Sequence, residues 1–243
     1  LYATSDGYTW ERIFDQGFDN PNNEAVWNLV ESDGYLYLAT ENNTLGARIY
    51  RTTDGRAWSP VSLGGFDGTD NTRVWGMAVF DGLNGLHLYA GTTNGSTGAE
   101  IWRTALPQPE ESWEQVEQAG FDGDADNRAI LDYVEYDGAL YAAVANSVDG
   151  TQVWRTMEGR TWTQVGTDGF GDVNNAGGYA LTVHDDALYI GTENANGAGV
   201  YRWDETDANW DPVNTPGFGD PNNTAVYALA TYDGSLYAGT WNG

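Results

Sequence analysis

The sequence predicts an all-β protein, a five-bladed β-propeller made of four-stranded antiparallel units. Three sets of residues recur along the 243-residue chain at intervals of 48 to 55 residues. Gly-Phe pairs begin at Gly17, Gly65, Gly120, Gly169 and Gly217, and Leu-Tyr pairs begin at Leu36, Leu88, Leu140, Leu188 and Leu236. Tryptophans keep the same steps at Trp10, Trp58, Trp113, Trp162 and Trp210. A period of this length is typical of propellers, in which each sheet buries its faces against its neighbours.

Each copy divides into four short runs rich in Val, Tyr, Trp and Thr, separated by Gly, Asn and Asp. Apolar residues alternate within these runs, which favours strands over helices. In the first full copy the expected strands cover residues 25–31, 35–40, 47–52 and 57–63. Asp33-Gly34 and Asp54-Gly55 stand at the joints, and Asp-Gly provides the positive φ that a two-residue hairpin requires. The sequence therefore predicts antiparallel meanders.

The two ends of the chain are expected to share one unit. Leu1-Tyr2 aligns with Ile49-Tyr50, so the chain opens at the third strand of a unit, and it ends after a second strand. Residues 1–16 are therefore expected to pair with residues 225–242, which closes the ring and removes exposed sheet edges. The chain then forms one domain, with repeat units at approximately 1–48, 49–100, 101–152, 153–199 and 200–243. An excerpt from a longer array is the alternative.

The charge of the chain excludes several classes of partner. Asp and Glu number 36 against 10 basic residues, which gives a net charge of -26. Such a field repels phosphate backbones and anionic bilayers, so we expect neither nucleic acid binding nor membrane insertion. The chain has no Cys, which excludes disulfides and thiolate metal sites. Because salt screens self-repulsion, the acidity favours a halophilic protein or another acidic protein outside the cell or on its surface.

Residues 4–10, 52–58 and 156–162 share a pattern of Thr, then Asp-Gly or Glu-Gly, then Trp. They resemble the Asp-box of sialidase-like (BNR) repeat propellers, although each is one residue shorter than that family's Ser-x-Asp-x-Gly-x-Thr-Trp pattern. Residues 106–112 interrupt the copy between the second and third of these segments, and residues 203–210 diverge from it. In that family the box is a structural hairpin, so the resemblance implies a fold and not an activity.

The sequence carries no catalytic motif. His87 and His184 are its only imidazoles, and serine hydrolase, zinc peptidase and P-loop signatures are absent. Arginines recur in the third strand of each unit and are expected to make structural pairs; they are Arg51, Arg103, Arg155 and Arg202. Asp132 breaks the repeat at a position held elsewhere by Asn28, Gly76, Ala180 and Ala228. It is a candidate glycosidase carboxylate or, alternatively, a solvated group near a central channel, and we expect a protein that is not an enzyme.

Asparagines gather on the rim formed by the longer loops. An Asn follows the second strand of every copy, at Asn42, Asn94, Asn146, Asn194 and Asn242. Trp241 precedes the last of them, where other copies have Glu, Thr or Ala. Amides beside an exposed aromatic ring suit a sugar, so these six residues are the predicted ligand-binding residues. The alternative is a set of loops capped by short polar side chains.

One loop has a spacing that favours a metal ion. Asp122, Asp124 and Asp126 alternate along the chain, as oxygen ligands of hard cations do. Carboxylate and amide oxygens suit Ca²⁺ better than transition metals, although the Gly and the distal Glu of an EF-hand are missing. Calcium at these three residues is therefore the one cofactor that the sequence predicts.

Together these patterns favour a non-enzymatic, lectin-like module that recognises glycans or other polyvalent surface ligands through the Asn-rich loop face. Equivalent weak sites on one rim gain avidity from polyvalent ligands. A structural or assembly subunit, or a spacer, of a larger cell-surface protein or filament is the alternative. A glycoside-processing enzyme is the second alternative.

Overall fold

The computed structural model describes residues 1–14, 17–18, 20–107 and 112–243. It begins with a hairpin of β1 (Tyr2–Ala3) and β2 (Glu11–Arg12). Four complete units follow. The first two consist of β3 (Ala25–Ser32), β4 (Tyr35–Glu41), β5 (Ile49–Thr52) and β6 (Ser59–Pro60), then β7 (Arg73–Gly82), β8 (Gly85–Thr93), β9 (Ile101–Ala105) and β10 (Glu114–Gln115). The next two consist of β11 (Asn127–Tyr136), β12 (Ala139–Asn146), β13 (Gln152–Thr156) and β14 (Thr163–Gln164), then β15 (Gly177–His184), β16 (Ala187–Glu193), β17 (Val200–Asp204) and β18 (Asn209–Pro212).

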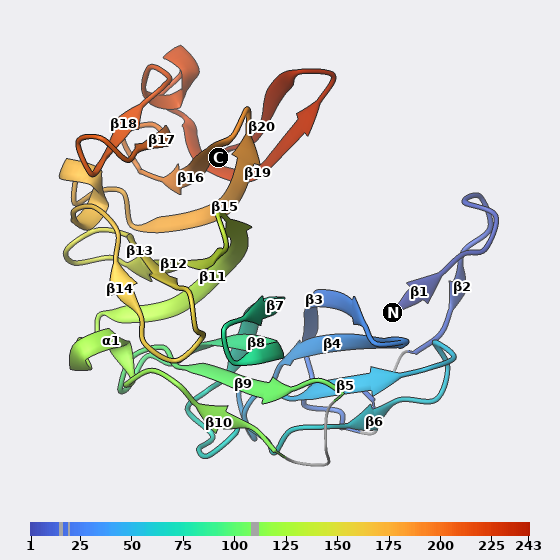
Figure 1. Ribbon diagram of the computed structural model, residues 1–243. Helices are drawn as coiled ribbons and strands as arrows, with labels where there is room; N and C mark the ends of the chain where they lie inside the picture. Colours follow the sequence, from blue (N-terminus) through green and yellow to red (C-terminus); the bar gives the residue numbers. More distant parts are fainter. Residues whose placement is uncertain (15–16, 19, 108–111) are drawn as a thin grey trace.

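A second hairpin, β19 (Asn223–Tyr232) and β20 (Ser235–Asn242), ends the chain. Short helical turns, α1 (Gly120–Gly123), η1 (Asp168–Gly171) and η2 (Pro216–Gly219), lie at three of the Gly-Phe pairs and contain left-handed residues. The units follow one another along an arc, from the blue β1–β2 hairpin to the red β19–β20 hairpin (Figure 1). The prediction of an all-β fold built from antiparallel meanders is confirmed.

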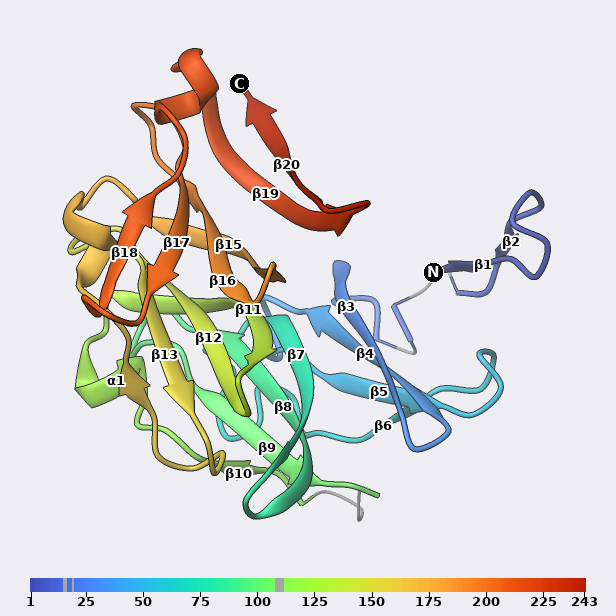
Figure 2. The same cartoon turned by 45° about the horizontal axis from the view of Figure 1, so that its top comes forward.

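The first strand of each unit lies on the inner side of the arc, and β6, β10, β14 and β18 lie outside (Figure 2). Neighbouring inner strands pack against one another. The backbone N–H that ends each second strand donates to a carbonyl of the next unit. These bonds join Asn42 to Thr72, Asn94 to Arg128, Asn146 to Ala176 and Asn194 to Thr224, at 2.8, 2.9, 3.0 and 2.8 Å. The Asn that follows each second strand is therefore a junction between units.

Each Gly-Phe pair forms a tight corner between two units. At Gly65 and Phe66 φ is +65° for both residues. A Cβ on Gly65 would lie 1.9 Å from the carbonyl oxygen of Gly68, so only glycine fits there. The ring of Phe66 stacks on Trp102 of the next unit, with 5.2 Å between centroids. The equivalent pairs are Phe18–Tyr50, Phe121–Trp154 and Phe170–Tyr201, at 5.2, 4.7 and 5.0 Å. The repeat that predicts the fold is thus the residue set that packs one unit on the next.

The described residues form an open ring, so the predicted closure between residues 1–16 and 225–242 is not observed in them; residues 15 and 16 of the first segment lie outside the described residues. Among the described strands β1 pairs with β2 alone, and β20 pairs with β19 alone. The two hairpins lie on opposite sides of the opening in both views (Figures 1 and 2). Local contacts hold β1–β2 on its own side, because Phe14 stacks on Phe18 at 4.6 Å and Glu11 pairs with Arg56 at 2.7 Å. Neither contact involves residues 225–242.

Across the described residues, the structure contains no helix that is long and apolar enough to cross a membrane.

Candidate functional site

The inner strands carry a β-bulge at one repeated position; they are β3, β7, β11, β15 and β19. In β3, Val26 pairs with Thr40 and Asn28 pairs with Ala39, which leaves Trp27 without a partner in the ladder. The residues at this bulge position are Trp27, Trp75, Leu131, Tyr179 and Tyr227. A bulge turns its extra side chain away from the regular pleat, and bulges are frequent beside functional sites. Four of these five residues are aromatic.

The aromatic bulge residues meet where the inner strands converge. Trp27 lies 4.0 Å from Trp75 between ring centroids, and Trp75 lies 6.2 Å from Tyr179. Tyr227 continues the series, with its ring 4.6 Å from Tyr179 and 6.5 Å from Trp241. We call these five residues the axial aromatic cluster. Three of its residues are exposed, since Trp27, Tyr227 and Trp241 are 40%, 48% and 57% exposed, whereas Trp75 and Tyr179 are partly buried.

Glu41 and Arg73 lie against one end of this cluster. Arg73 forms an ion pair with Glu41, and its guanidinium lies 5.2 Å from the Trp27 centroid and 5.1 Å from that of Trp75. Glu41 also accepts hydrogen bonds from Trp27 Nε1 at 2.9 Å and from Asn43 Nδ2 at 3.1 Å. Burial alone raises the pKa of Glu41, but the donors Arg73, Trp27 and Asn43 outweigh it and lower that pKa. Glu41 is therefore an ionised, fixed carboxylate.

Glu193 is the second carboxylate in contact with the cluster. It lies at the end of β16, at the position that Glu41 occupies in β4, and it is partly exposed. Its Oε2 accepts a hydrogen bond from Tyr179 Oη at 3.2 Å. Aromatic faces with carboxylates beside them can stack on a sugar ring and accept hydrogen bonds from its hydroxyl groups.

Asp132 follows the bulge residue of β11 on the inner strand, and it is only partly exposed. Its Oδ2 accepts the backbone N–H of Leu181 in the next unit at 2.8 Å, and its Oδ1 accepts that of Tyr133 at 2.9 Å. Burial raises the pKa of Asp132 to about 6, although these two N–H groups act in the opposite direction. This carboxyl group joins two units and also titrates in the range useful to a general acid.

The predicted ligand-binding asparagines have hydrogen-bond partners within the protein. Asn42, Asn94, Asn146 and Asn194 are all less than 5% exposed. In each unit the Nδ2 group donates to the Asn that closes the preceding loop. The Oδ1 atoms of Asn42, Asn94, Asn146 and Asn194 accept one or two backbone N–H groups from the following loop. The Nδ2 bonds join Asn42–Asn23, Asn94–Asn71, Asn146–Asn127, Asn194–Asn175 and Asn242–Asn223, at 2.8, 3.1, 3.0, 2.9 and 3.1 Å.

A ligand could reach these four buried amides only by displacing bonds that shape the loops. Ligand binding by them stays a prediction, and the geometry supports the alternative of capped loops. Asn242 and Trp241 lie on the open β20 and are exposed. Of the six predicted residues, Trp241 alone is part of the axial aromatic cluster.

The structure gives no support to the predicted calcium loop. The described residues contain no group of three or more His, Cys, Asp or Glu placed to hold a metal ion. Asp124 instead accepts the Asp126 backbone N–H at 2.9 Å and the Asn146 amide at 3.2 Å. Asp126 pairs with Arg128 at 2.7 Å. Asp122 has a left-handed φ of +58° in the corner that follows Gly120. Calcium binding stays a prediction.

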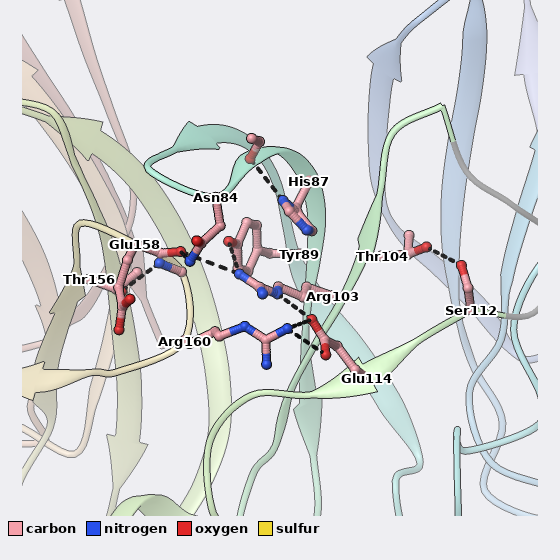
Figure 3. Close-up of polar contacts among 12 residues, drawn as sticks. Asn84, His87, Tyr89, Arg103, Thr104, Ser112, Glu114, Thr156, Glu158 and Arg160 are labelled. Carbon is pink, nitrogen blue, oxygen red and sulfur yellow. Dashed lines mark hydrogen bonds and ion pairs between the residues drawn. The ribbon is translucent and has the colours of Figure 1, made fainter.

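The recurring arginines are represented by Arg103, which is buried and joins two units (Figure 3). Its Nε donates to Glu114 at 2.8 Å, and its Nη1 donates to Tyr89 Oη and to the Glu158 carbonyl, both at 3.3 Å. Arg160, from the same hairpin as Glu158, donates to both oxygens of Glu114 at 2.9 Å. These bonds tie the Arg103 guanidinium to protein groups of two units, which favours the predicted structural role for Arg103.

The Asp-box-like segments form local hairpins. Asp6 Oδ1 accepts the backbone N–H groups of Thr9 and Tyr8, both at 2.8 Å, and these bonds hold the pKa of Asp6 far below its usual range. Asp54 accepts the N–H groups of Ala57 and Arg56 in the same way. These carboxylates lock their own turns, as the resemblance implies.

A cavity of about 760 Å³ lies away from the axis, between Tyr35 and residues 51–61. The guanidinium of Arg51 lies 4.6 Å from the Tyr35 ring centroid there. Its described lining contains one aromatic ring and no carboxylate, so it offers less to a sugar than the axial aromatic cluster does.

No protein-family model matches the chain, and no curated protein sequence matches it. Among solved structures the chain is similar to the WD40 β-propeller domain of Doa1, with a TM-score of 0.55 and 13% identity over 88% of this chain. It is also similar to a "putative exo-beta-1,3-galactanase" from Bifidobacterium bifidum s17, with a TM-score of 0.53 and 15% identity over 91% of this chain and 92% of that one. A third is a protein of unknown function from Bacteroides thetaiotaomicron, with a TM-score of 0.52 and 13% identity over 89% of this chain and 52% of that one.

These similarities define the fold as a β-propeller. The chain spans 62% of the length of the Doa1 domain, and neither five blades nor the Asp-box family follows from the comparison. The expectation that the protein is not an enzyme is corrected. The structure described as a putative exo-beta-1,3-galactanase shares this fold over 92% of its length, so the fold does not exclude an enzyme.

Sequence reasoning missed Trp27, Trp75, Tyr179 and Tyr227 as site residues. Their signal is present, because an aromatic residue occupies the same repeat position in four of the five copies. The repeat itself concealed it, since recurring aromatics are also expected in the core. The bulge at these positions is defined by how two strands pair, so the sequence of one strand does not reveal it.

Proposed function

We propose that this propeller acts on glycans and binds a saccharide against the axial aromatic cluster. One observation carries the proposal: four bulged aromatic side chains from different units, two of them exposed and two partly buried, meet beside Glu41 and Glu193. A neutral saccharide fits better than an acidic one, because the net charge of -26 repels anions. An extracellular location, where polysaccharides are abundant, is part of this proposal.

The test is a glycan array followed by calorimetry. The array contains neutral oligosaccharides, including β-1,3-galacto-oligosaccharides because of the structural similarity reported above, and matched acidic oligosaccharides. Trp27→Ala and Trp75→Ala are each expected to weaken binding by roughly 5- to 30-fold, since loss of a stacking partner costs about 1–2 kcal/mol. Tyr8→Ala is the matched control, because Tyr8 is 92% exposed and lies outside the cluster.

An array on which no saccharide binds would refute the proposal. Equal losses in Trp75→Ala and Tyr8→Ala would also refute it, because the cluster would then contribute nothing specific.

Asp132 supports a more specific version, in which the protein is a glycoside-processing enzyme. A carboxyl group with a pKa of about 6 is protonated in a useful fraction of molecules near neutral pH and can donate a proton to a glycosidic oxygen. Glu193, partly exposed beside Tyr179, would be the second carboxylate.

Turnover of a bound oligosaccharide, measured as released reducing ends, tests this version. Asp132→Asn is expected to lower kcat at least about 100-fold and to change saccharide affinity little. Asp126→Asn, on a loop outside the cluster, is the control. Unchanged turnover in Asp132→Asn would exclude this role.

We also propose that five units surround the axis when the propeller is complete. Four are whole in the structure, and the fifth is divided between the β1–β2 and β19–β20 hairpins. Tyr227 and Trp241 belong to the divided unit, so its completion would enclose one side of the cluster.

A further inference from the structure

Strand β20 has a free edge. The second strands β4, β8, β12 and β16 each pair with the first and the third strand of their unit, whereas β20 pairs with β19 alone among the strands that the structure describes. Its side chains are exposed as a result. Tyr237 is 56% exposed, although its equivalents Tyr37, Tyr89 and Tyr141 are 0%, 1% and 2% exposed.

The β1–β2 hairpin is the complementary half of such a unit. By the repeat it corresponds to a third and a fourth strand, and within the described part of the chain β1 pairs with β2 alone. Tyr2 is 59% exposed, whereas the equivalent Tyr50 is 2% exposed. Trp10 is 62% exposed, whereas the equivalent Trp162 is 5% exposed. Both halves therefore expose residues that complete units bury.

The repeat gives the register in which these halves fit. In the first complete unit Leu38 pairs with Tyr50 and Leu36 pairs with Thr52. Aligned copies place Ala238 at the position of Leu38 and Tyr2 at that of Tyr50. By the same alignment Leu236 faces Thr4.

We propose that the β20 edge of one copy accepts the β1–β2 hairpin of a second copy of this chain. The Phe14–Phe18 stack and the Glu11–Arg56 ion pair hold the hairpin away from its own β20. Strand addition would satisfy the free backbone groups of β20 and cover Tyr237 and Tyr2. Because donor and acceptor lie at opposite ends of the arc, the contact is heterologous and joins copies head to tail. This assembly does not depend on glycan binding.

Cysteine cross-linking tests the register directly, because the chain has no native Cys. Tyr2→Cys protein is mixed with Ala238→Cys protein that carries a larger tag, and the mixture is oxidised. We expect the mixed disulfide between copies to form at least about tenfold faster than in a mixture with Ser235→Cys, which lies three residues away on β20. Thr4→Cys with Leu236→Cys is a second pair in the same register. Sedimentation of the wild-type protein is expected to show a mass that rises with concentration.

Two results would overturn the proposal. If the doubly substituted Tyr2→Cys, Ala238→Cys chain forms its disulfide within a monomer and the mixture forms none, the hairpin closes its own ring. If neither Cys pair cross-links above the Ser235→Cys control and the protein sediments as a monomer at all concentrations, the edge takes no hairpin.

Discussion

Replacing Asn127 by Ala tests whether the amide hydrogen bonds between neighbouring loops stabilise the fold. Asn127 is 1% exposed, and its Nδ2 donates to the Gly120 carbonyl at 2.9 Å and to Gln152 Oε1 at 3.0 Å. Its Oδ1 accepts from Asn146 Nδ2 at 3.0 Å. Alanine removes all three bonds and leaves their partners buried. At about 1 kcal/mol for each bond, we expect a loss of roughly 3 kcal/mol in unfolding free energy.

For a chain of this length that loss lowers Tm by roughly 6–12 °C, which calorimetry measures readily. Asn223→Ala is the matched control, since Asn223 makes the equivalent bonds to Gly217 and Asn242 beside the exposed edge. Water can replace its lost bonds, so we expect only about 1 kcal/mol there. If Asn127→Ala lowers Tm no more than Asn223→Ala does, the inter-loop amide bonds do not stabilise the fold and the reasoning is wrong.

Three further predictions concern pH, the corner glycines and salt. The pKa of Asp132 is raised from 3.8 to about 6 in the folded protein, so its contribution to stability is fully present below about pH 4 and is lost as pH rises through 6. The stability of the wild type relative to Asp132→Asn should therefore fall by up to roughly 3 kcal/mol between pH 4 and pH 7, and a constant difference in urea titrations would contradict this. Gly65→Ala should destabilise by roughly 2–4 kcal/mol because of the contact with Gly68, whereas Gly55→Ala, with φ of +72° and open space around it, should cost about 1 kcal/mol; equal costs would contradict the corner geometry. Raising NaCl to about 1 M, where the Debye length is about 3 Å, should raise Tm because it screens the net charge of -26, and a Tm independent of salt would count against the halophilic hypothesis.

The fold could be predicted largely because its contacts repeat. Gly65 and Phe66 recur because every corner needs the same left-handed turn and the same ring to stack on the next unit, so each junction repeats the same residues. The closure could not be predicted from the same repeat. Alignment of Leu1-Tyr2 with Ile49-Tyr50 shows which residues could pair, but whether two chain ends meet depends on the angle added at every unit.

The candidate site divides in the same way. Trp241 was found because it breaks the repeat, and so was Asp132. Trp27 and Trp75 were missed because they keep the repeat, and their exposure comes from a bulge between strands. The sequence cannot distinguish the two interpretations of Asn42 and its equivalents, because an amide that caps its own loop and an amide that binds a ligand stand in the same sequence pattern.

The most direct test is a crystal structure of the protein with the neutral oligosaccharide that binds best on the array. If the axial aromatic cluster is the saccharide site, we expect a sugar ring stacked on Trp27, Trp75 or Tyr179, within hydrogen-bond distance of Glu193 or Glu41. A sugar bound along the loops of Asn42 and Asn94, or in the cavity beside Tyr35, with the axial aromatic cluster empty, would contradict it.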